Sequence, residues 1–192
     1  MKLKEILLSD NIVKSINDNL DYILKIIPEI KYMIGFDHRH PHHHLDVWNH
    51  TLLALSISPC NLEIRLALLL HDIGKPFSYQ DGDIRHFHNH PNISEYMSRE
   101  ILNRLEFNCV NIDDICSLIK YHDTKICKEE IKNNISYYKK LAIIQYCDAL
   151  AHNPTKLEKR INYLLEIFFS LKEYEINDIE NMYKNILRMK NN

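Results

Sequence analysis

Apolar residues recur at intervals of three and four along almost the whole chain, as in residues 20–27 and 161–169. This spacing places them on one face of an α-helix, whereas the strict alternation of a half-buried β-strand is almost absent. The pattern therefore predicts an all-α bundle of about seven to nine helices of ordinary length. One segment differs: around Asp81 and Gly82, residues 77–87 predict a short hairpin or an irregular loop.

Residues that cap helices stand where several periodic segments begin. An Asp, Asn or Ser side chain can accept a hydrogen bond from a backbone N–H of the first turn, which has no partner within the helix. The candidate caps are Asp46, Asn61, Ser94, Ser136 and Asn177. The chain of 192 residues contains no internal repeat and no low-complexity linker, so we expect a single domain over residues 1–192.

Composition excludes several functional classes. The three glycines lie far apart, so the chain can form neither a P-loop nor a Gly-x-Gly-x-x-Gly dinucleotide site. With 24 basic and 26 acidic residues, nucleic acid is not favoured as a partner, and only residues 184–190 form a small basic patch. The five cysteines form no Cys-x-x-Cys pair. The longest apolar run, residues 66–70, is too short to span a membrane. The first residues do not read as a secretory signal, so we expect a cytoplasmic protein without membrane contact.

The distribution of histidine requires a chemical explanation. Ten of the twelve histidines lie between His38 and His90, which core packing does not predict. For the dense stretch from His38 to His43, the simplest interpretation is an exposed loop that binds metal ions weakly.

His71 and Asp72 stand at the end of an apolar helix predicted from Asn61 onward, directly before Ile73 and Gly74. Burying an imidazole and a carboxylate without partners costs several kcal/mol. A divalent metal ion removes this cost, because both groups are good ligands and a carboxylate can bridge two ions.

Four more residues of these types lie in or beside apolar helical segments. Each alone is more often an ordinary core residue. A helical bundle, however, builds a metal site when several helices each direct one ligand inward. The four are His50, His90, His122 and Asp148.

Three stretches resemble the HD-domain metal-dependent phosphohydrolase superfamily, whose pattern is an N-terminal His, a central His-Asp and a C-terminal Asp. They are Asp46–Leu52, Arg65–Pro76 and Arg85–His90, and they look most like the HD domain attached to bacterial CCA-adding tRNA nucleotidyltransferases. The resemblance implies an HD-type helical core over residues 44–152, with helical extensions on both sides. Nothing upstream supplies the Gly-Ser and Asp-x-Asp elements of a nucleotidyltransferase domain, so we do not expect this chain to add nucleotides to tRNA.

The resemblance also implies a ligand set for one or two metal ions. His50, His71, Asp72 and Asp148 would hold the first ion, and Asp72, His90 and His122 the second. Mixed imidazole and carboxylate ligation favours Fe, Mn, Co, Ni or Zn over Mg or Ca. In one departure from the family, which commonly has Gly before the histidine at position 90, this chain has Asn89.

Besides Asp72, which would bridge the ions, four residues are candidates for a role near the reacting phosphate. Lys75 would supply positive charge to a phosphoryl group, or else is an exposed lysine at a helix end. His86 and His88 would bind phosphate or protonate a leaving oxygen, or else are solvated loop residues. Asp123 would orient a histidine ligand, or else is an exposed acid.

The expected function is metal-dependent hydrolysis of a phosphomonoester or phosphodiester, on a nucleotide or similar small molecule, by a metal-bound hydroxide. Two alternatives stand beside it: a non-catalytic metal-binding or ligand-sensing module, and an RNA-binding helical accessory protein. The complete ligand set together with Lys75 favours the enzyme, because a sensor would not need a lysine facing phosphate.

Overall fold

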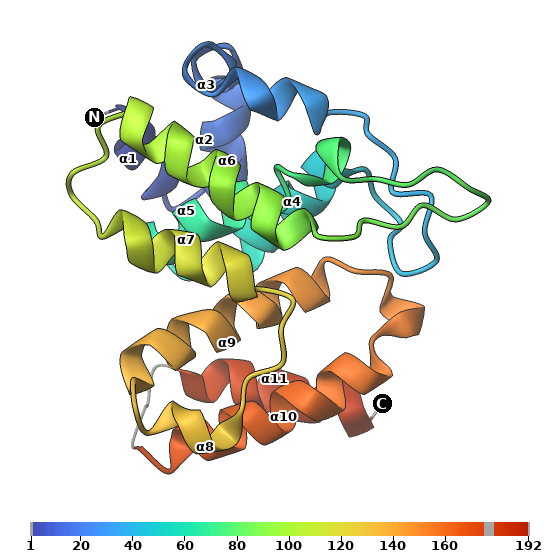
Figure 1. The fold of residues 1–192 in the computed structure, drawn as a ribbon. Coiled ribbons are helices and arrows are strands. Elements are labelled where there is room, and N and C mark those ends of the chain that lie inside the picture. Colours follow the sequence, from blue (N-terminus) through green and yellow to red (C-terminus); the bar gives the residue numbers. More distant parts are fainter. Residues whose placement is uncertain (1, 175–178, 192) are drawn as a thin grey trace.

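The computed structural model describes residues 2–174 and 179–191, and within them its regular structure is entirely helical, with no β-strand (Figure 1). The all-α prediction is confirmed. The α-helices are α1 (Lys2–Leu7), α2 (Ile12–Asp18), α3 (Leu20–Ile26), α4 (Val47–Ile57), α5 (Leu62–Leu70), α6 (His90–Arg104), α7 (Ile112–Tyr121), α8 (Lys128–Ile131), α9 (Ile135–Leu150), α10 (Glu158–Lys172) and α11 (Glu180–Asn191). Short 3-10 helices lie at Pro28–Tyr32, Lys75–Phe77 and Pro154–Lys156.

The prediction of seven to nine helices is too low, since the described residues form eleven α-helices. The N-terminal periodic segment breaks at residues 8–11 and at Asn19 into three helices of six or seven residues. A further helix, α8, is a single turn of four residues. Short helices such as these depend on tertiary packing for their stability, so periodicity alone does not define their ends.

Two of the predicted caps are confirmed. Asp46 Oδ1 accepts from the backbone N–H of Asn49 at 2.8 Å and begins α4. Asn61 Oδ1 accepts from Ile64 N–H at 3.1 Å and begins α5.

Two other cap predictions are wrong, and the fifth, Asn177, lies outside the described residues. Ser94 is inside α6, because that helix already begins at His90 and has a proline in its first turn, where the missing N–H costs nothing. Ser136 is inside α9, which Asn134 caps by accepting from the third residue of the helix.

The segment 77–87 is an irregular loop closed by one antiparallel bridge between Gln80 and His86, rather than a hairpin of two strands. It lies against the loop that precedes α4, and the two extend together at the right of Figure 1. Arg85 Nη1 donates to the Asp37 carbonyl at 2.7 Å, and Arg39 Nη2 donates to the carbonyl of residue 82 at 2.9 Å. These bonds join the two loops beside the starts of α4 and α6.

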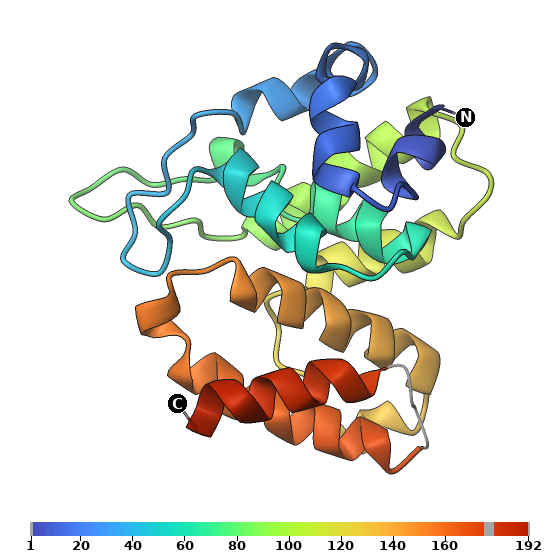
Figure 2. The same ribbon diagram turned by 180° about the vertical axis from the view of Figure 1, so that it is seen from behind.

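The core is built around α5, in which every residue from Ile64 to Leu70 is buried. This helix packs on α1, α4, α7 and α9. Figure 1 shows α1–α7 in the upper part of the molecule and α8–α11 in the lower part, where α9 is the helix next to the upper group. Seen from behind, α11 lies across α10 (Figure 2). Among the described helices, none has the length and apolar character needed to cross a membrane.

Candidate metal centre

Six side chains that the sequence analysis gives as candidate metal ligands lie together inside the bundle. They stand in the first turns of α4 and α6 and at the ends of α5, α7 and α9. None is more than 8% exposed. The six are His50, His71, Asp72, His90, His122 and Asp148.

Four of these residues surround one position. Asp148 Oδ1 lies 2.9 Å from His50 Nε2 and 3.7 Å from His71 Nε2. Asp72 Oδ2 lies 3.3 Å from His71 Nε2 and 3.7 Å from His50 Nε2. Two carboxylate oxygens and two imidazole nitrogens therefore face one another.

The other oxygen of Asp72 faces a second group. Asp72 Oδ1 lies 3.5 Å from His90 Nε2 and 3.8 Å from His122 Nε2. The two histidine nitrogens lie 3.3 Å apart. Asp72 thus stands between both groups with one oxygen toward each, as a bridging carboxylate would.

Backbone carbonyls fix the tautomer of every histidine in the two groups. Each Nδ1 lies between 2.6 and 3.1 Å from a carbonyl oxygen, which can only accept. Each Nδ1 therefore carries the ring hydrogen in the neutral imidazole, and the lone pair of Nε2 points at the carboxylates, as ligation requires. The carbonyls belong to Leu68, Phe87, Ile119 and Ala151.

The donor set fits a bound metal ion. His71 Nε2 and Asp72 Oδ1 are buried without a hydrogen-bond partner, and Asp72 Oδ2 has only the ion pair with Lys75, at 2.8 Å. Buried polar atoms are rarely left in this state, because each costs free energy unless it is paired. Three overlapping sets each offer one ligand atom per residue, all within 4.8 Å of one another: His50, His71 and Asp72; His50, Asp148 and His152; and Asp72, His90 and His122. A divalent cation at these positions would satisfy the unpartnered atoms.

The charges of the site favour cations. Burial opposes ionisation of Asp72 and Asp148, but neighbouring histidines and cations hold the pKa of both carboxyls well below the usual range. Burial also opposes a charge on His71, yet the two carboxylates outweigh it and raise its pKa to about 10. At His90, burial and the Lys75 ammonium lower the pKa to about 3. The positive charge of the His71 imidazolium therefore balances part of the negative charge of the two carboxylates, as a metal cation would.

Two backbone features bring the His-Asp turn against α6. A Cβ on Gly74 would lie 2.6 Å from Ser94 N and 2.9 Å from the His90 carbonyl oxygen, so only glycine allows this approach. Asn89, which replaces the family's usual glycine, has φ 64°. Asparagine is among the few side-chain-bearing residues that tolerate this left-handed conformation. The departure therefore preserves the turn that orients His90.

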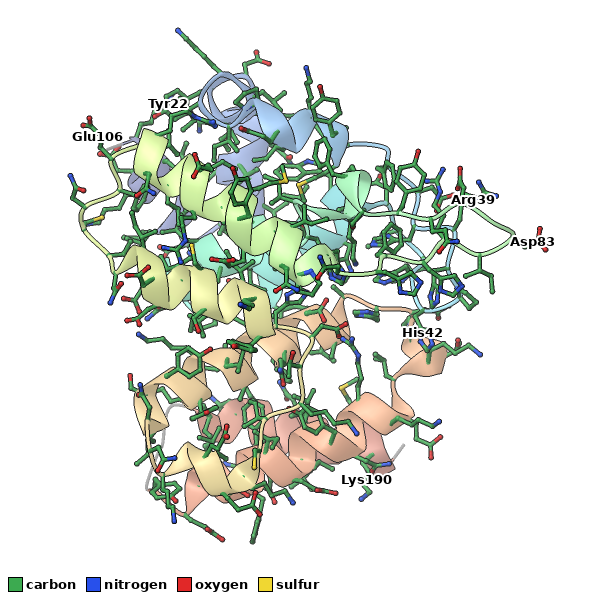
Figure 3. All side chains as sticks on the ribbon, in the orientation of Figure 1. Tyr22, Arg39, His42, Asp83, Glu106 and Lys190 are labelled. Carbon is green, nitrogen blue, oxygen red and sulfur yellow. The ribbon has the colours of Figure 1, made fainter. Side chains whose placement is uncertain are left out.

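A cavity of about 280 Å³ opens beside the two ligand groups. Its lining is rich in positive and imidazole groups, among them Lys75, Arg85, Arg160 and His42. Figure 3 shows nitrogen-bearing side chains gathered near the labelled His42 and Arg39. Such a lining suits an anionic ligand of small size.

The candidate catalytic residues differ from one another in burial and in position relative to the cavity. Lys75 is 5% exposed, so it is not the exposed helix-end lysine of the alternative interpretation, and its Nζ lies 2.8 Å from Asp72 Oδ2. His86 is exposed and lines the cavity. His88 is exposed, stacks on His86 at a centroid distance of 5.6 Å, and does not line it. Asp123 does not orient a histidine, because its Oδ1 accepts from Arg160 Nη2 at 2.8 Å.

The interpretation of residues 38–43 as an exposed loop is wrong at three of its four histidines. His38 is buried, and His40 and His43 are half-buried. The ring of His43 stacks parallel on that of His38, with centroids 3.6 Å apart. His42 is exposed. The cause is non-local, since the loop of residues 77–87 covers one side of this segment.

Two residues of the site were not predicted from the sequence. His152 is buried one turn after Asp148, and its Nδ1 lies 2.7 Å from the Asp148 carbonyl oxygen. Arg160 Nη1 donates to Asp148 Oδ2 at 2.6 Å. The four-residue spacing on one helix could have indicated His152. No local signal indicates Arg160, because its contact depends on how α10 packs.

Comparison with known proteins gives matches over the part of the chain that contains the candidate ligands. Residues 42–166 match the HD domain family, and this range includes all six candidate ligands. The A-adding tRNA nucleotidyltransferase of Deinococcus radiodurans is 35% identical over 88 residues, which cover 42% of this chain and 20% of that protein. The CC-adding tRNA nucleotidyltransferase of Thermus thermophilus is 32% identical over 111 residues, which cover 54% of this chain and 25% of that protein. The matched segments are thus a quarter or less of these relatives.

Proposed function

This chain belongs to the HD domain family, and from that premise we propose that it is a metal-dependent phosphohydrolase acting on a small phosphoester such as a nucleotide. The observation that carries the proposal is the convergence of six buried His and Asp side chains, with unpartnered ligand atoms, beside a cavity lined by cations. Hydrolysis of a phosphoester needs that combination, because the anion must be bound while a water molecule is activated next to it.

The ligand groups define which residues would hold metal. His50, His71, Asp72 and Asp148 would hold one ion, and Asp72, His90 and His122 a second. When bound, such ions supply Lewis-acid activation of water and neutralise charge on the phosphate. The imidazole-rich set favours a transition metal over Mg or Ca.

Two cations of the chain pair with the ligand carboxylates. Lys75 is paired with Asp72, Arg160 is paired with Asp148, and both line the cavity. A phosphoryl group in the cavity would therefore meet a positive side chain beside each of these carboxylates. Their part in the reaction is to bind and orient the phosphate oxygens as negative charge moves onto them.

A proton is needed on the leaving oxygen, and His86 is the candidate donor at the cavity rim. His88 stacks on His86 and does not line the cavity, so it has no direct part in this proposal. His86→Ala should then slow substrates with a poor leaving group, such as an alkyl phosphate, more than an aryl phosphate whose leaving oxygen needs no proton.

The test is a hydrolysis panel on the purified protein. Mononucleotides, 2′,3′-cyclic nucleotides, dinucleoside polyphosphates and an aryl phosphate are each supplied with Mn, Fe, Co, Ni, Zn or Mg. Asp72→Asn removes the bridging carboxylate, and Asp114→Asn, an exposed acid on α7, is the matched control. We expect hydrolysis with at least one transition metal, lost in D72N and kept in D114N. Metal binding without hydrolysis of any substrate class would favour the metal-sensing alternative, and hydrolysis that persists in D72N would contradict the proposed site.

A further inference from the structure

His38 is buried with both ring nitrogens in contact with polar partners. Nδ1 lies 2.9 Å from the Leu45 carbonyl oxygen, and Nε2 lies 3.1 Å from Lys75 Nζ. Because a carbonyl only accepts, Nδ1 carries the ring hydrogen and Nε2 accepts from the ammonium. The ring is stacked on His43 and meets the ring of Phe87 nearly at right angles, with centroids 5.7 Å apart. Its position is therefore fixed from several sides.

Lys75 has three kinds of neighbour. Its Nζ forms an ion pair with Asp72, donates a hydrogen bond to His38 Nε2, and lies 5.6 Å from the centre of the Phe87 ring. The side chain also lines the cavity. An ammonium group has three N–H donors, so these contacts can fix its direction and still leave a donor for a group inside the cavity.

We propose that His38 is a positioning residue, which holds the Lys75 ammonium at the cavity wall so that it can bind an anionic oxygen of the substrate. The catalytic consequence rests on the proposed phosphohydrolase function. The contact itself does not depend on that function, and it can be measured separately.

The chemistry of imidazole suits this role better than a second carboxylate would. A neutral ring accepts a hydrogen bond without cancelling the charge of the lysine, whereas an aspartate would form an ion pair and weaken its attraction for phosphate. Burial and the nearby ammonium keep the pKa of His38 far below neutrality, at about 2. The ring is therefore neutral in the physiological range, and Lys75 keeps positive charge for the substrate.

Two amide side chains separate the two nitrogens of His38. In His38→Asn the amide reaches only the position of Nδ1, so it can bond Leu45 but falls short of Lys75. In His38→Gln the longer amide can place its oxygen at the position of Nε2 and restore the acceptor. His44→Asn is the matched control, because His44 is exposed in the same loop. If H38N does not fold, His38→Leu replaces it as the variant without an acceptor.

The first measurement is pulse labelling of lysines with acetic anhydride in metal-free protein, read by peptide mass spectrometry, with exposed Lys120 as reference. A hydrogen bond to a charged group changes the ratio of bound to released ammonium by about tenfold or more. Because only a released Lys75 is open to the reagent, H38N should raise its labelling rate by about tenfold. H38Q and H44N should stay within about twofold of the wild type. An unchanged rate in H38N, or H38Q labelled as fast as H38N, would overturn the positioning role.

The second measurement is inhibition by inorganic phosphate of whichever hydrolysis the substrate panel reveals. H38N should weaken phosphate binding about tenfold, H38Q should restore it, and H38N should add little in a Lys75→Ala background. Equal effects of H38N with and without Lys75 would show that His38 acts some other way. If the panel reveals no hydrolysis, the proposed function fails, while the labelling experiment still tests the contact.

Discussion

Replacing Arg160 with glutamine should weaken metal binding at the group that contains Asp148. Arg160 Nη1 donates to Asp148 Oδ2 at 2.6 Å, while Oδ1 of the same carboxylate faces His50 and His71. The arginine thus holds the carboxylate with one oxygen toward the ligand nitrogens. Without it, Oδ2 loses its charged donor and the carboxylate can rotate.

The size of the effect follows from this geometry. Loss of a residue that orients a metal ligand typically costs 10–100-fold in metal affinity, which corresponds to about 1.4–2.7 kcal/mol. The other contact of Arg160, with Asp123, joins a side chain that is 47% exposed. Such pairs contribute only about 0.2–1 kcal/mol. Asp123→Asn should therefore weaken metal binding far less than Arg160→Gln.

Calorimetric titration with Ni or Zn measures the affinity directly in the wild type, R160Q and D123N. Thermal unfolding with and without metal gives an independent value, because a tenfold weaker site loses about 1.4 kcal/mol of metal-dependent stabilisation at saturating concentration. Stability in chelator is subtracted for each variant. Wild-type affinity in R160Q, or an equal loss in D123N, would refute the idea that Arg160 acts by orienting Asp148.

Three further outcomes are expected. Asp72→Ala should abolish hydrolysis and metal binding while the far-ultraviolet circular dichroism stays helical, because the apolar core does not use this carboxylate; a variant with near-normal turnover would contradict the bridging role. His90→Ala and His122→Ala should each lower the bound metal, measured by elemental analysis, from about two ions toward one per protomer, and an unchanged ratio would argue against a second ion. Metal binding at pH 8 should release about one proton, because the carboxylates raise the pKa of His71 to about 10 and only the neutral ring can bind an ion. Calorimetry in two buffers of different ionisation enthalpy measures the proton release. If no proton is released, His71 is already neutral before the metal binds.

The parts of the fold that local chemistry determines could be predicted from the sequence. The helix after Asn61 has a cap, an apolar face and a terminating Gly-Pro region within a few residues, and α5 follows that pattern. The ligands could be found for the same reason, since His71 and Asp72 are adjacent and the others interrupt apolar helices. Asn89 also has a local explanation, in its left-handed backbone.

The parts that depend on contacts between distant segments could not be predicted. His38 is buried because two loops far apart in sequence are joined through Arg85 and Arg39, and nothing within its own loop indicates this. Lys75 could be identified as a phosphate-binding candidate, but its contact with His38 depends on the same loops. Arg160 reaches Asp148 only because α10 packs beside α9.

The central claim is that metal held by these six side chains is required for phosphoester hydrolysis. The most direct measurement titrates a transition metal into metal-free protein and records bound ions and turnover in the same samples, using the best substrate of the panel. We predict that turnover rises with the ions bound and that Asp72→Ala shows neither. Turnover in metal-free protein, or turnover in Asp72→Ala at wild-type rate without bound metal, would contradict the claim.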